Sequence, residues 1–345
     1  MRLNILGVQI DLLLARVRES FMREHKGDLE QASRGGGMGA SMNERELRSL
    51  NGYRTALYLN RQYVEEYDNY RITLKAVKLW AKNKGIYSQI YGYLGGAALS
   101  IMLAKICQLY PRYSPLELLD RFFFIFANWV WTIPVLVERM EYMERPDSEI
   151  VVFTPLDPHM NAAHSVSKIT CAVTRKQLRL ASKLIQDINK GKRQWQDLFR
   201  PLDFFKEYPN FIEISVMGEG LEEFVRWRGN VESKMRKFIQ HLESQSELSH
   251  GVEVHPYPRA FPAKHPHFPH CYKYYIGLKA APNTPLSDYA EIDLAPSVRN
   301  FLELLESYPE IDKAPQRINI GFNHLGRSAL PVELLNSFQE AFTGK

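Results

Sequence analysis

The stretch RITLKAVKLWAKNKGIYSQIYGYLGG, Arg71 to Gly96, decides how the fold of this chain is interpreted. Its first half has the spacing of an amphipathic helix over Arg71–Asn83, with an expected apolar face made of Ile72, Ala76, Leu79 and Trp80. A separate basic stripe follows the same helix and comprises Arg71, Lys75, Lys78 and Lys82. Such a stripe is either a solvated helix face or a phosphate-binding one, and spacing alone does not separate the two.

The second half of the stretch, Gly85 to Gly96, combines aromatic and glycine residues. Tyr87 and Tyr91 offer ring faces on which a purine could stack. Gly95 and Gly96 would let a ligand approach the backbone closely. The alternative is an ordinary loop between two packed helices.

Outward from this stretch, the chain alternates between expected helices and loops. Leu3–Ala15 is expected to form one or two strands, and the glycine-rich Gln31–Ser41 is expected to be a loop. Helical spacing extends over Asn51–Glu138. Within and after it we expect a buried helix at Ala97–Tyr110, an aromatic core run at Phe122–Trp131, a loop at Arg139–Thr154 and a helix at Lys176–Asn189.

The last third of the chain predicts a β-α-β-β-α-β order, the split pattern of ferredoxin-like domains and of RNA-recognition modules. The long helix should bury a face made of Phe224, Val231, Met235, Phe238 and Leu242. The expected elements are strands at Phe211–Met217, Val252–His255, Tyr272–Leu278 and Arg317–Phe322, and helices at Gly220–Ser246 and Ser297–Tyr308.

Composition limits the function classes. The 345 residues, 45% of them hydrophobic and 24% charged, are enough for two or three globular domains. The net charge of +5 permits a polyanionic partner without requiring one. Three scattered cysteines argue against a disulfide framework and favour a reducing compartment. The longest apolar stretch, Phe122–Val137, is shorter than the roughly 20 residues of a membrane span, so no membrane partner is expected.

Two further features could carry chemistry. Asp11 lies within the apolar run VQIDLLLAR, where a buried carboxylate would need a cation, a metal or hydrogen-bond donors. The alternative is that Asp11 faces water at a strand edge. The segment KHPHFPHC, Lys264–Cys271, contains three histidines and a cysteine that could bind zinc, but its prolines favour an extended loop.

Taken in order, several segments resemble the eukaryotic poly(A) polymerases, which belong to the DNA polymerase β-like nucleotidyltransferases. These segments are VQIDLLLAR, RSLNGYR, the Arg71–Gly96 stretch, KICQLYP, FFFIFANWVWTIPVL, VFTPLDPHMNAAHSVS, FVRWRGNVESKMRKFI and YKYYIGL. The resemblance implies template-independent addition of AMP from ATP to an RNA 3′ end, with Mg²⁺ or Mn²⁺ ions held by three aspartates. It also implies a nuclear protein that works with cleavage and polyadenylation proteins.

The resemblance implies an α+β fold in three parts. These are a remnant of the nucleotidyltransferase palm at residues 1–50, a central helical domain at 51–190 and a ferredoxin-like RNA-binding domain at 191–345. Arg226, Lys234, Arg236 and Lys237 in the last part could contact RNA phosphates, or form a solvated helix face.

Carried over residue by residue, the resemblance assigns a role to six positions. Asp11 matches the third catalytic, metal-binding aspartate. Asn51 matches the position near the sugar and phosphates, and Lys78 matches the lysine that contacts the ATP phosphates. Tyr87 matches the tyrosine that also contacts the nucleotide, and Gly96 and Ala97 match the backbone pair beside the base.

The chain also departs from the family pattern. The Asp-x-Asp pair, expected several tens of residues before Asp11, is not in the 345 residues, and Gln89 stands where many relatives have Asn. We therefore expect a polymerase sequence that is shortened at its N-terminus. The alternative is a non-catalytic RNA-binding or scaffold protein with the same fold. A relative with another product, uridylylated RNA or oligoadenylate, is disfavoured by the RNA-binding module.

Overall fold

The computed structural model describes residues 2–5, 8–24, 42–139, 145–156, 159–244, 251–280, 293–306, 317–332 and 334–335. The chain forms two compact units. The first unit comprises Met1–Ala76, Gly96–Ile125 and Trp129–His164, and the second comprises Val77–Gly95, Phe126–Asn128 and Ser165–Lys345.

The first unit begins with an antiparallel hairpin of β1 (Arg2–Ile5) and β2 (Val8–Asp11). Strands were expected over Leu3–Ala15, but the second strand ends at Asp11. The three leucines that follow are 50%, 67% and 82% exposed. A short helix, α1 (Glu19–Glu24), comes next. The expected loop at Gln31–Ser41 lies outside the described residues.

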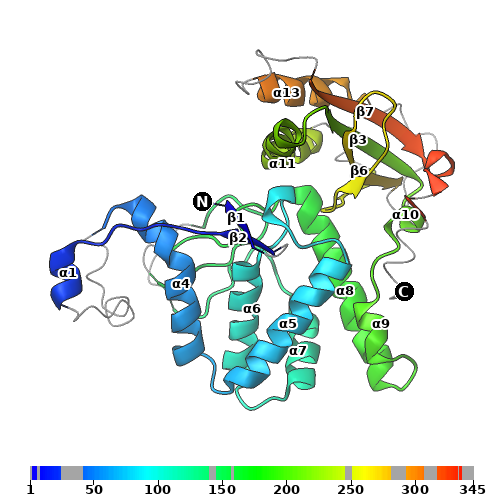
Figure 1. Cartoon of the computed structure of the whole chain (residues 1–345). Helices are drawn as coiled ribbons and strands as arrows, with labels where there is room; N and C mark the ends of the chain where they lie inside the picture. The colour runs from blue at the N-terminus through cyan, green and yellow to red at the C-terminus, as the bar shows by residue number, and fades with distance from the viewer. Residues whose placement is uncertain are drawn as a thin grey trace. The chain divides into compact units, whose positions relative to one another are not determined.

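Helices make up most of the rest of the first unit (Figure 1). They are α4 (Glu44–Gln62), α5 (Tyr67–Asn83), α6 (Gly96–Leu109) and α7 (Pro115–Ala127), with α5 continuing into the second unit. Helix α6 is the buried helix expected from its sequence. In the aromatic run, Phe122 and Phe123 are buried as expected, whereas Phe124 is 45% exposed.

The apolar face expected for α5 is wrong in part. Ile72 and Leu79 are 52% and 48% exposed, whereas Thr73, Val77 and Trp80 are buried. Thr73 lies inside because its hydroxyl donates hydrogen bonds to the carbonyls of Asn69 (2.7 Å) and Pro115 (3.3 Å). A hydrogen-bonded threonine is tolerated in a core, so apolar spacing alone chose the wrong side of the helix.

The second unit begins its long run of chain with α8 (Lys168–Asn189). This helix starts eight residues before the expected Lys176, because the side chain of Ser167 and that of Thr170 form a reciprocal capping box. Two short helices follow, α9 (Trp195–Phe199) and α10 (Phe204–Glu207).

A five-stranded antiparallel sheet completes the second unit, and its four longer strands have the expected β-α-β-β-α-β order, to which the unpredicted two-residue strand β5 is added. The strands β4-β6-β3-β7 lie side by side in that order, and β5 pairs with β6. The elements are β3 (Asn210–Gly218), α11 (Leu221–Ser244), β4 (Val252–Pro256), β5 (Phe261–Pro262), β6 (His270–Ala280), α13 (Ala295–Glu306) and β7 (Ile318–Gly326). The α+β fold class is therefore confirmed.

Both faces of the sheet are covered. Helices α11 and α13 lie on one face (Figure 1), and every residue of the face expected for α11 is buried. Aromatic and leucine side chains fill part of the other face: Phe204, Phe205, Tyr208, Phe211, Tyr257, Phe261, Tyr275, Leu330 and Leu334. RNA-recognition modules stack bases on the equivalent face. In this chain those side chains already form a core there.

A buried carboxylate occupies the centre of that second face. Glu213 on β3 is 2% exposed and accepts hydrogen bonds from Lys273 (3.0 Å to each oxygen), the Tyr275 hydroxyl (2.9 Å) and the Asn323 amide (3.2 Å). These partners come from the two strands that flank β3. The ion pair and its donors satisfy a charge that would otherwise be costly to bury.

No helix within the described ranges is long and apolar enough to cross a membrane. Cys107, Cys171 and Cys271 are buried and are not in disulfide bonds.

Candidate functional site

Lys78 is a half-buried cation on α5. Burial, together with the charge of Lys82, lowers its pKa. It forms no ion pair with another described residue, unlike Arg71 nearly two turns before it, which lies 3.2 Å from Asp68. The Lys82 ammonium lies 5.5 Å from the centre of the Tyr87 ring. This end of α5 therefore presents positive charge beside an aromatic ring.

The loop after α5 is closely packed. Gly85 adopts φ +66°, and a Cβ atom there would lie 2.5 Å from the Tyr257 ring. Gly92 adopts φ +82°, and its carbonyl accepts a hydrogen bond from the Thr170 hydroxyl. Both positions require glycine because L side chains rarely adopt such backbone angles.

The two tyrosines expected to face a nucleotide differ in the structure. Tyr91 is 6% exposed, and burial raises the pKa of its hydroxyl well above the ordinary value. Tyr87 is half-buried and keeps part of its ring accessible. Tyr91 therefore belongs to the core, and Tyr87 is the aromatic residue of the pair that a ligand could reach.

His255 on β4 anchors this loop. Its ring is fully buried, with Nε2 3.1 Å from the Gly85 carbonyl oxygen and Nδ1 2.8 Å from the Tyr208 hydroxyl. A carbonyl only accepts, so Nε2 donates to Gly85. The Tyr93 hydroxyl also donates to the Pro256 carbonyl, at 2.9 Å. Strand β4 of the sheet thus holds the loop that carries Tyr87.

An ion-pair network lies beside this anchor. The Tyr208 hydroxyl lies 2.8 Å from Glu253 Oε1 as well as from the His255 ring, and its one proton is donated to one of the two at a time. Glu253 also accepts from the Lys176 ammonium of α8 at 2.7 and 2.9 Å. Lys176 and Lys279 both reach Glu207, at 3.4 and 3.1 Å. Their charges lower the pKa of Glu207 although its burial acts in the opposite direction. The sequence gives little signal for this network, because its members are scattered over about a hundred residues.

Asn51, on α4 in the first unit, is 2% exposed. Its amide nitrogen donates to the Thr154 hydroxyl (3.4 Å), and its amide oxygen accepts from the Thr55 hydroxyl (3.2 Å). Thr154 also accepts from the Met160 backbone at 2.9 Å. The side chain of Asn51 therefore connects α4 to the segment that precedes α8.

The six predicted site residues are divided between the units. Gly96 and Ala97 open helix α6 in the first unit, and Ala97 is exposed there. Asp11 ends β2 in the same unit, paired with Arg2, and its side chain lies outside the described residues. Lys78 and Tyr87 belong to the second unit. Asp11, Gly96 and Ala97 lie at the end of a strand or the start of a helix, whereas Asn51 and Lys78 lie within helices and Tyr87 lies in a loop.

The histidine-rich segment forms no evident metal site. Among the described residues, no group of three or more His, Cys, Asp or Glu side chains could hold a metal ion. His265 instead packs its ring against His267 (5.9 Å) and Phe268 (5.3 Å), and Cys271 is buried within β6.

Two of the four basic residues expected to meet RNA on α11, Lys234 and Arg226, have contacts within the protein. Lys234 donates to the Leu304 carbonyl at 2.5 Å, near the C-terminal end of α13. The Arg226 guanidinium lies 3.9 Å from Glu222. A cation at a helix C-terminus stabilises that helix, so Lys234 has a structural role in this unit.

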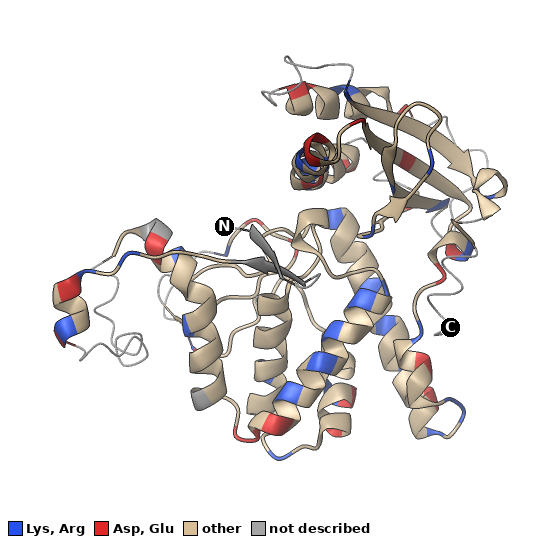
Figure 2. Ribbon diagram, viewed as in Figure 1, with Lys and Arg blue, Asp and Glu red and all other residues tan. Residues whose placement is uncertain are grey.

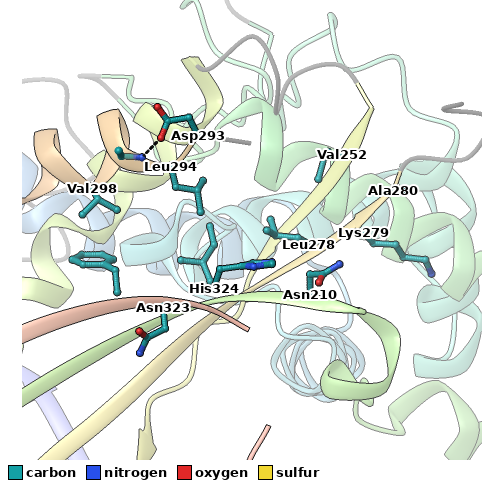
Figure 3. A pocket seen from close by; sticks show the side chains of 13 residues that line it. Asn210, Val252, Leu278, Lys279, Ala280, Asp293, Leu294, Val298, Asn323 and His324 are labelled. Atoms are coloured by element: carbon teal, nitrogen blue, oxygen red, sulfur yellow. Dashed lines mark hydrogen bonds between the residues drawn. The ribbon is translucent and has the colours of Figure 1, made fainter. Parts of the chain in front are cut away.

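A pocket of about 990 Å³ lies at one end of the sheet (Figure 3). Leu278, Leu294 and Val298 give it apolar walls, and Asn210 and His324 point toward it in Figure 3. Asp293 at its rim accepts a hydrogen bond from the Ala295 amide at 2.8 Å, which caps α13. None of the six predicted site residues lines this pocket.

Comparison with known proteins gives a consistent result along the chain. Residues 69–201 match the family model described as "Poly(A) polymerase central domain", and residues 203–268 match "Poly(A) polymerase predicted RNA binding domain". Together these matches cover more than half of the chain. The boundary between them falls between α9 and α10.

Curated relatives agree. The chain is 30% identical to "Poly(A) polymerase" of Dictyostelium discoideum over 343 residues, covering 94% of this chain and 41% of that protein. It is 29% identical to "Nuclear poly(A) polymerase 4" of Arabidopsis thaliana (89% of this chain, 42% of that protein). It is 31% identical to "Poly(A) polymerase PAPalpha" of Candida albicans (75% of this chain, 48% of that protein). The chain spans less than half the length of these relatives. From the two family models and these relatives, we conclude that the chain belongs to the eukaryotic poly(A) polymerase family.

Proposed function

We propose that this chain acts in template-independent transfer of AMP from ATP to the 3′ end of RNA. In that reaction the RNA 3′ oxygen bonds to the α-phosphorus of ATP, the bond to pyrophosphate breaks, and the proton of the 3′ hydroxyl passes to water. The observation that carries the proposal is the half-buried Lys78, which forms no ion pair with another described residue. It lies one helical turn before Lys82, whose ammonium group faces the Tyr87 ring.

Lys78 supplies charge to the triphosphate. A lysine whose pKa is lowered by burial gains interaction energy when an anion replaces the lost water. Its point charge can follow the negative charge that develops on the leaving pyrophosphate. Tyr87 then positions the nucleotide with its ring and hydroxyl, supported by the His255 anchor beneath the loop.

The remaining predicted residues take supporting roles. Gly96 and Ala97 present backbone groups at the start of α6, where the base can lie close to the chain. Asn51 is only 2% exposed, and its amide donates a hydrogen bond to Thr154. To contact the ligand, this amide must release Thr154.

Mg²⁺ or Mn²⁺ is implied by the family. A dedicated Mg²⁺ site takes several oxygen ligands, and Asp11 is the one carboxylate of this chain that we assign to it. Within the part of the chain that the structure describes, no cluster of potential ligands completes such a site. These residues do not fit the metal by themselves, so the proposal includes no step through it.

We assign residues 1–50 to the palm, 51–190 to the central domain and 191–345 to the RNA-binding domain, with cleavage and polyadenylation proteins as partners. Relatives named nuclear poly(A) polymerases support a nuclear site of action.

Binding of ATP by the purified chain tests the proposal. Replacing Lys78 with Met should weaken ATP binding by about 10- to 100-fold, the effect of losing a hydrogen bond to a charged group. Lys75→Met is the matched control, because Lys75 is an exposed lysine of the same helix, and it should change the affinity less than about threefold.

Equal losses in the two variants would contradict the assigned role of Lys78. A chain that binds oligo(A) but not ATP would favour the non-catalytic RNA-binding alternative. Labelled ATP incorporated into oligo(A) would establish that this chain is itself active.

A further inference from the structure

A row of basic side chains runs along the exposed side of α8, and no position of it was among the sequence predictions. We call it the α8 ridge. It consists of Lys168, Arg175, Arg179, Lys183 and Lys190, of which the last directly follows the helix. All five are exposed. Spacings of seven, four, four and seven residues place them in one line along a helix. At 1.5 Å per residue the line is about 33 Å long.

The ridge is not neutralised. None of its five cations forms an ion pair with another described residue. Some other exposed basic residues on helices have a carboxylate beside them, as in the pairs Arg23–Glu19, Arg71–Asp68 and Arg226–Glu222, whereas Lys75, Lys82 and Lys237 form no ion pair with another described residue. Figure 2 shows blue bands along α8 and along the expected stripe of α5. The α8 ridge is therefore a line of unpaired positive charge.

Lys176 shows the contrast on α8 itself. It follows Arg175 directly in sequence and lies seven residues before Lys183, so it borders the ridge, and Glu253 and Glu207 neutralise it. The ridge cations have no such ion pair with another described residue. Helix α8 therefore carries one paired lysine beside a row of cations that have no ion-pair partner among the described residues.

The ridge also opposes local helix stability. Arg175 and Arg179, and Arg179 and Lys183, are like-charge pairs four residues apart, a spacing at which such pairs destabilise a helix. The helix tolerates them because its other side is buried and its start is fixed by the Ser167 capping box. The repulsion between these neighbouring cations falls when an anion binds to them.

We propose that the α8 ridge is a track for the phosphate backbone of single-stranded RNA. This inference rests on the proposed function and adds a surface to it. A single line of cations fits a linear polyanion, whereas binding an anionic membrane also requires an inserted apolar face. Helix α8 contains no aromatic residue, so the ridge follows phosphates without stacking bases. The RNA-binding family match begins at residue 203, shortly after the ridge ends.

The salt dependence of RNA binding tests the track. The probes are fluorescein-labelled 15-nucleotide oligo(A) and oligo(U), measured by anisotropy with the full chain between 50 and 200 mM KCl. The ridge variant carries Arg175→Gln, Arg179→Gln and Lys183→Gln. Each lost phosphate contact reduces the slope of log K against log salt by about 0.7, so the slope should fall by about 2. A fourfold rise in salt then weakens wild-type binding about 20-fold more than it weakens variant binding.

The control variant removes the same charge elsewhere. Arg112→Gln, Lys206→Gln and Lys264→Gln are exposed positions off α8, and their salt slope should stay close to that of the wild type. Oligo(U) should respond to the ridge variant as oligo(A) does. The ridge variant should also keep wild-type ATP affinity and thermal midpoint.

The proposed RNA track is contradicted if the slope of log K against log salt falls equally in the ridge and control variants, or if the ridge variant keeps the wild-type slope. It is also overturned if the ridge variant loses binding to a deca-glutamate peptide and keeps its binding to oligo(A), because the surface then serves an acidic protein. Failure of the proposed function is distinguishable, since it appears as absent ATP binding in the wild type.

Discussion

The buried His255 should make the stability of the second unit fall as the pH is lowered. Burial lowers the pKa of this histidine to about 4, although the Gly85 carbonyl and the carboxylates of Glu253 and Glu207 oppose the shift and Lys176 adds to it. An unfolded histidine titrates near 6.5. Between these two pH values the unfolded chain binds a proton that the folded chain does not, so stability is lost as the pH falls.

The size of this effect follows from the shift. About 2.5 pKa units at 1.36 kcal/mol each give a loss approaching 3 kcal/mol at pH 4, and about 2 kcal/mol at pH 5. Replacing His255 with Phe keeps a ring in the site but leaves the Gly85 carbonyl without its donor. Loss of this hydrogen bond should lower the free energy of unfolding of the His255→Phe variant by about 2 kcal/mol at pH 7.5. The stabilities of wild type and variant should therefore meet near pH 5.

Urea unfolding of both proteins at pH 5.0 and 7.5, followed by tryptophan fluorescence, measures the difference. Other titrating groups cancel because the two proteins share them. Ile214→Val, which shortens a buried side chain of β3 that does not titrate, is the control and should show a difference that does not change with pH. If the His255→Phe difference is the same at both pH values, His255 titrates normally and the reasoning fails.

Three further predictions concern the sheet and the ridge helix. Gly277→Ala should lower the free energy of unfolding by about 1–3 kcal/mol in urea titrations, because its Cβ atom would lie 2.5 Å from the ring of the hydrogen-bonded Tyr208; an unchanged midpoint would mean that this ring can move. Glu213→Leu should cost about 3 kcal/mol by the same measurement, and adding Lys273→Met should recover part of it, whereas simple addition of the two losses would argue against the buried pair. Ser167→Ala should cost about 1 kcal/mol and increase hydrogen exchange in the first turn of α8, while unchanged exchange there would contradict the capping role.

Several features could be read from local sequence patterns. The β-α-β-β-α-β order and the buried face of α11 follow from strand and helix periodicities, which depend on near neighbours in the chain. The buried helix α6 follows from an almost wholly apolar segment. The ridge of α8 is also present as spacing, but apolar periodicity alone misses its first residues, because the start of the helix is set by the capping box of Ser167 and Thr170.

Other features were settled by contacts between distant segments. Periodicity predicted that Ile72 and Leu79 would face the core from α5, whereas Thr73, which donates a hydrogen bond to the Pro115 carbonyl, lies inside in their place. Tyr87 and Tyr91 are alike in sequence, yet only packing makes one of them core and leaves the other accessible.

The sequence by itself determined the family, the order of elements and the positions of basic residues, because these depend on residue type and spacing along the chain. Tertiary structure alone decided that His255 holds the loop of Tyr87 and that Lys176 is neutralised, whereas Arg175 beside it has no ion-pair partner among the described residues. The physical reason is that burial and pairing of a polar group depend on which remote side chains surround it, and spacing along one helix or strand does not contain that information.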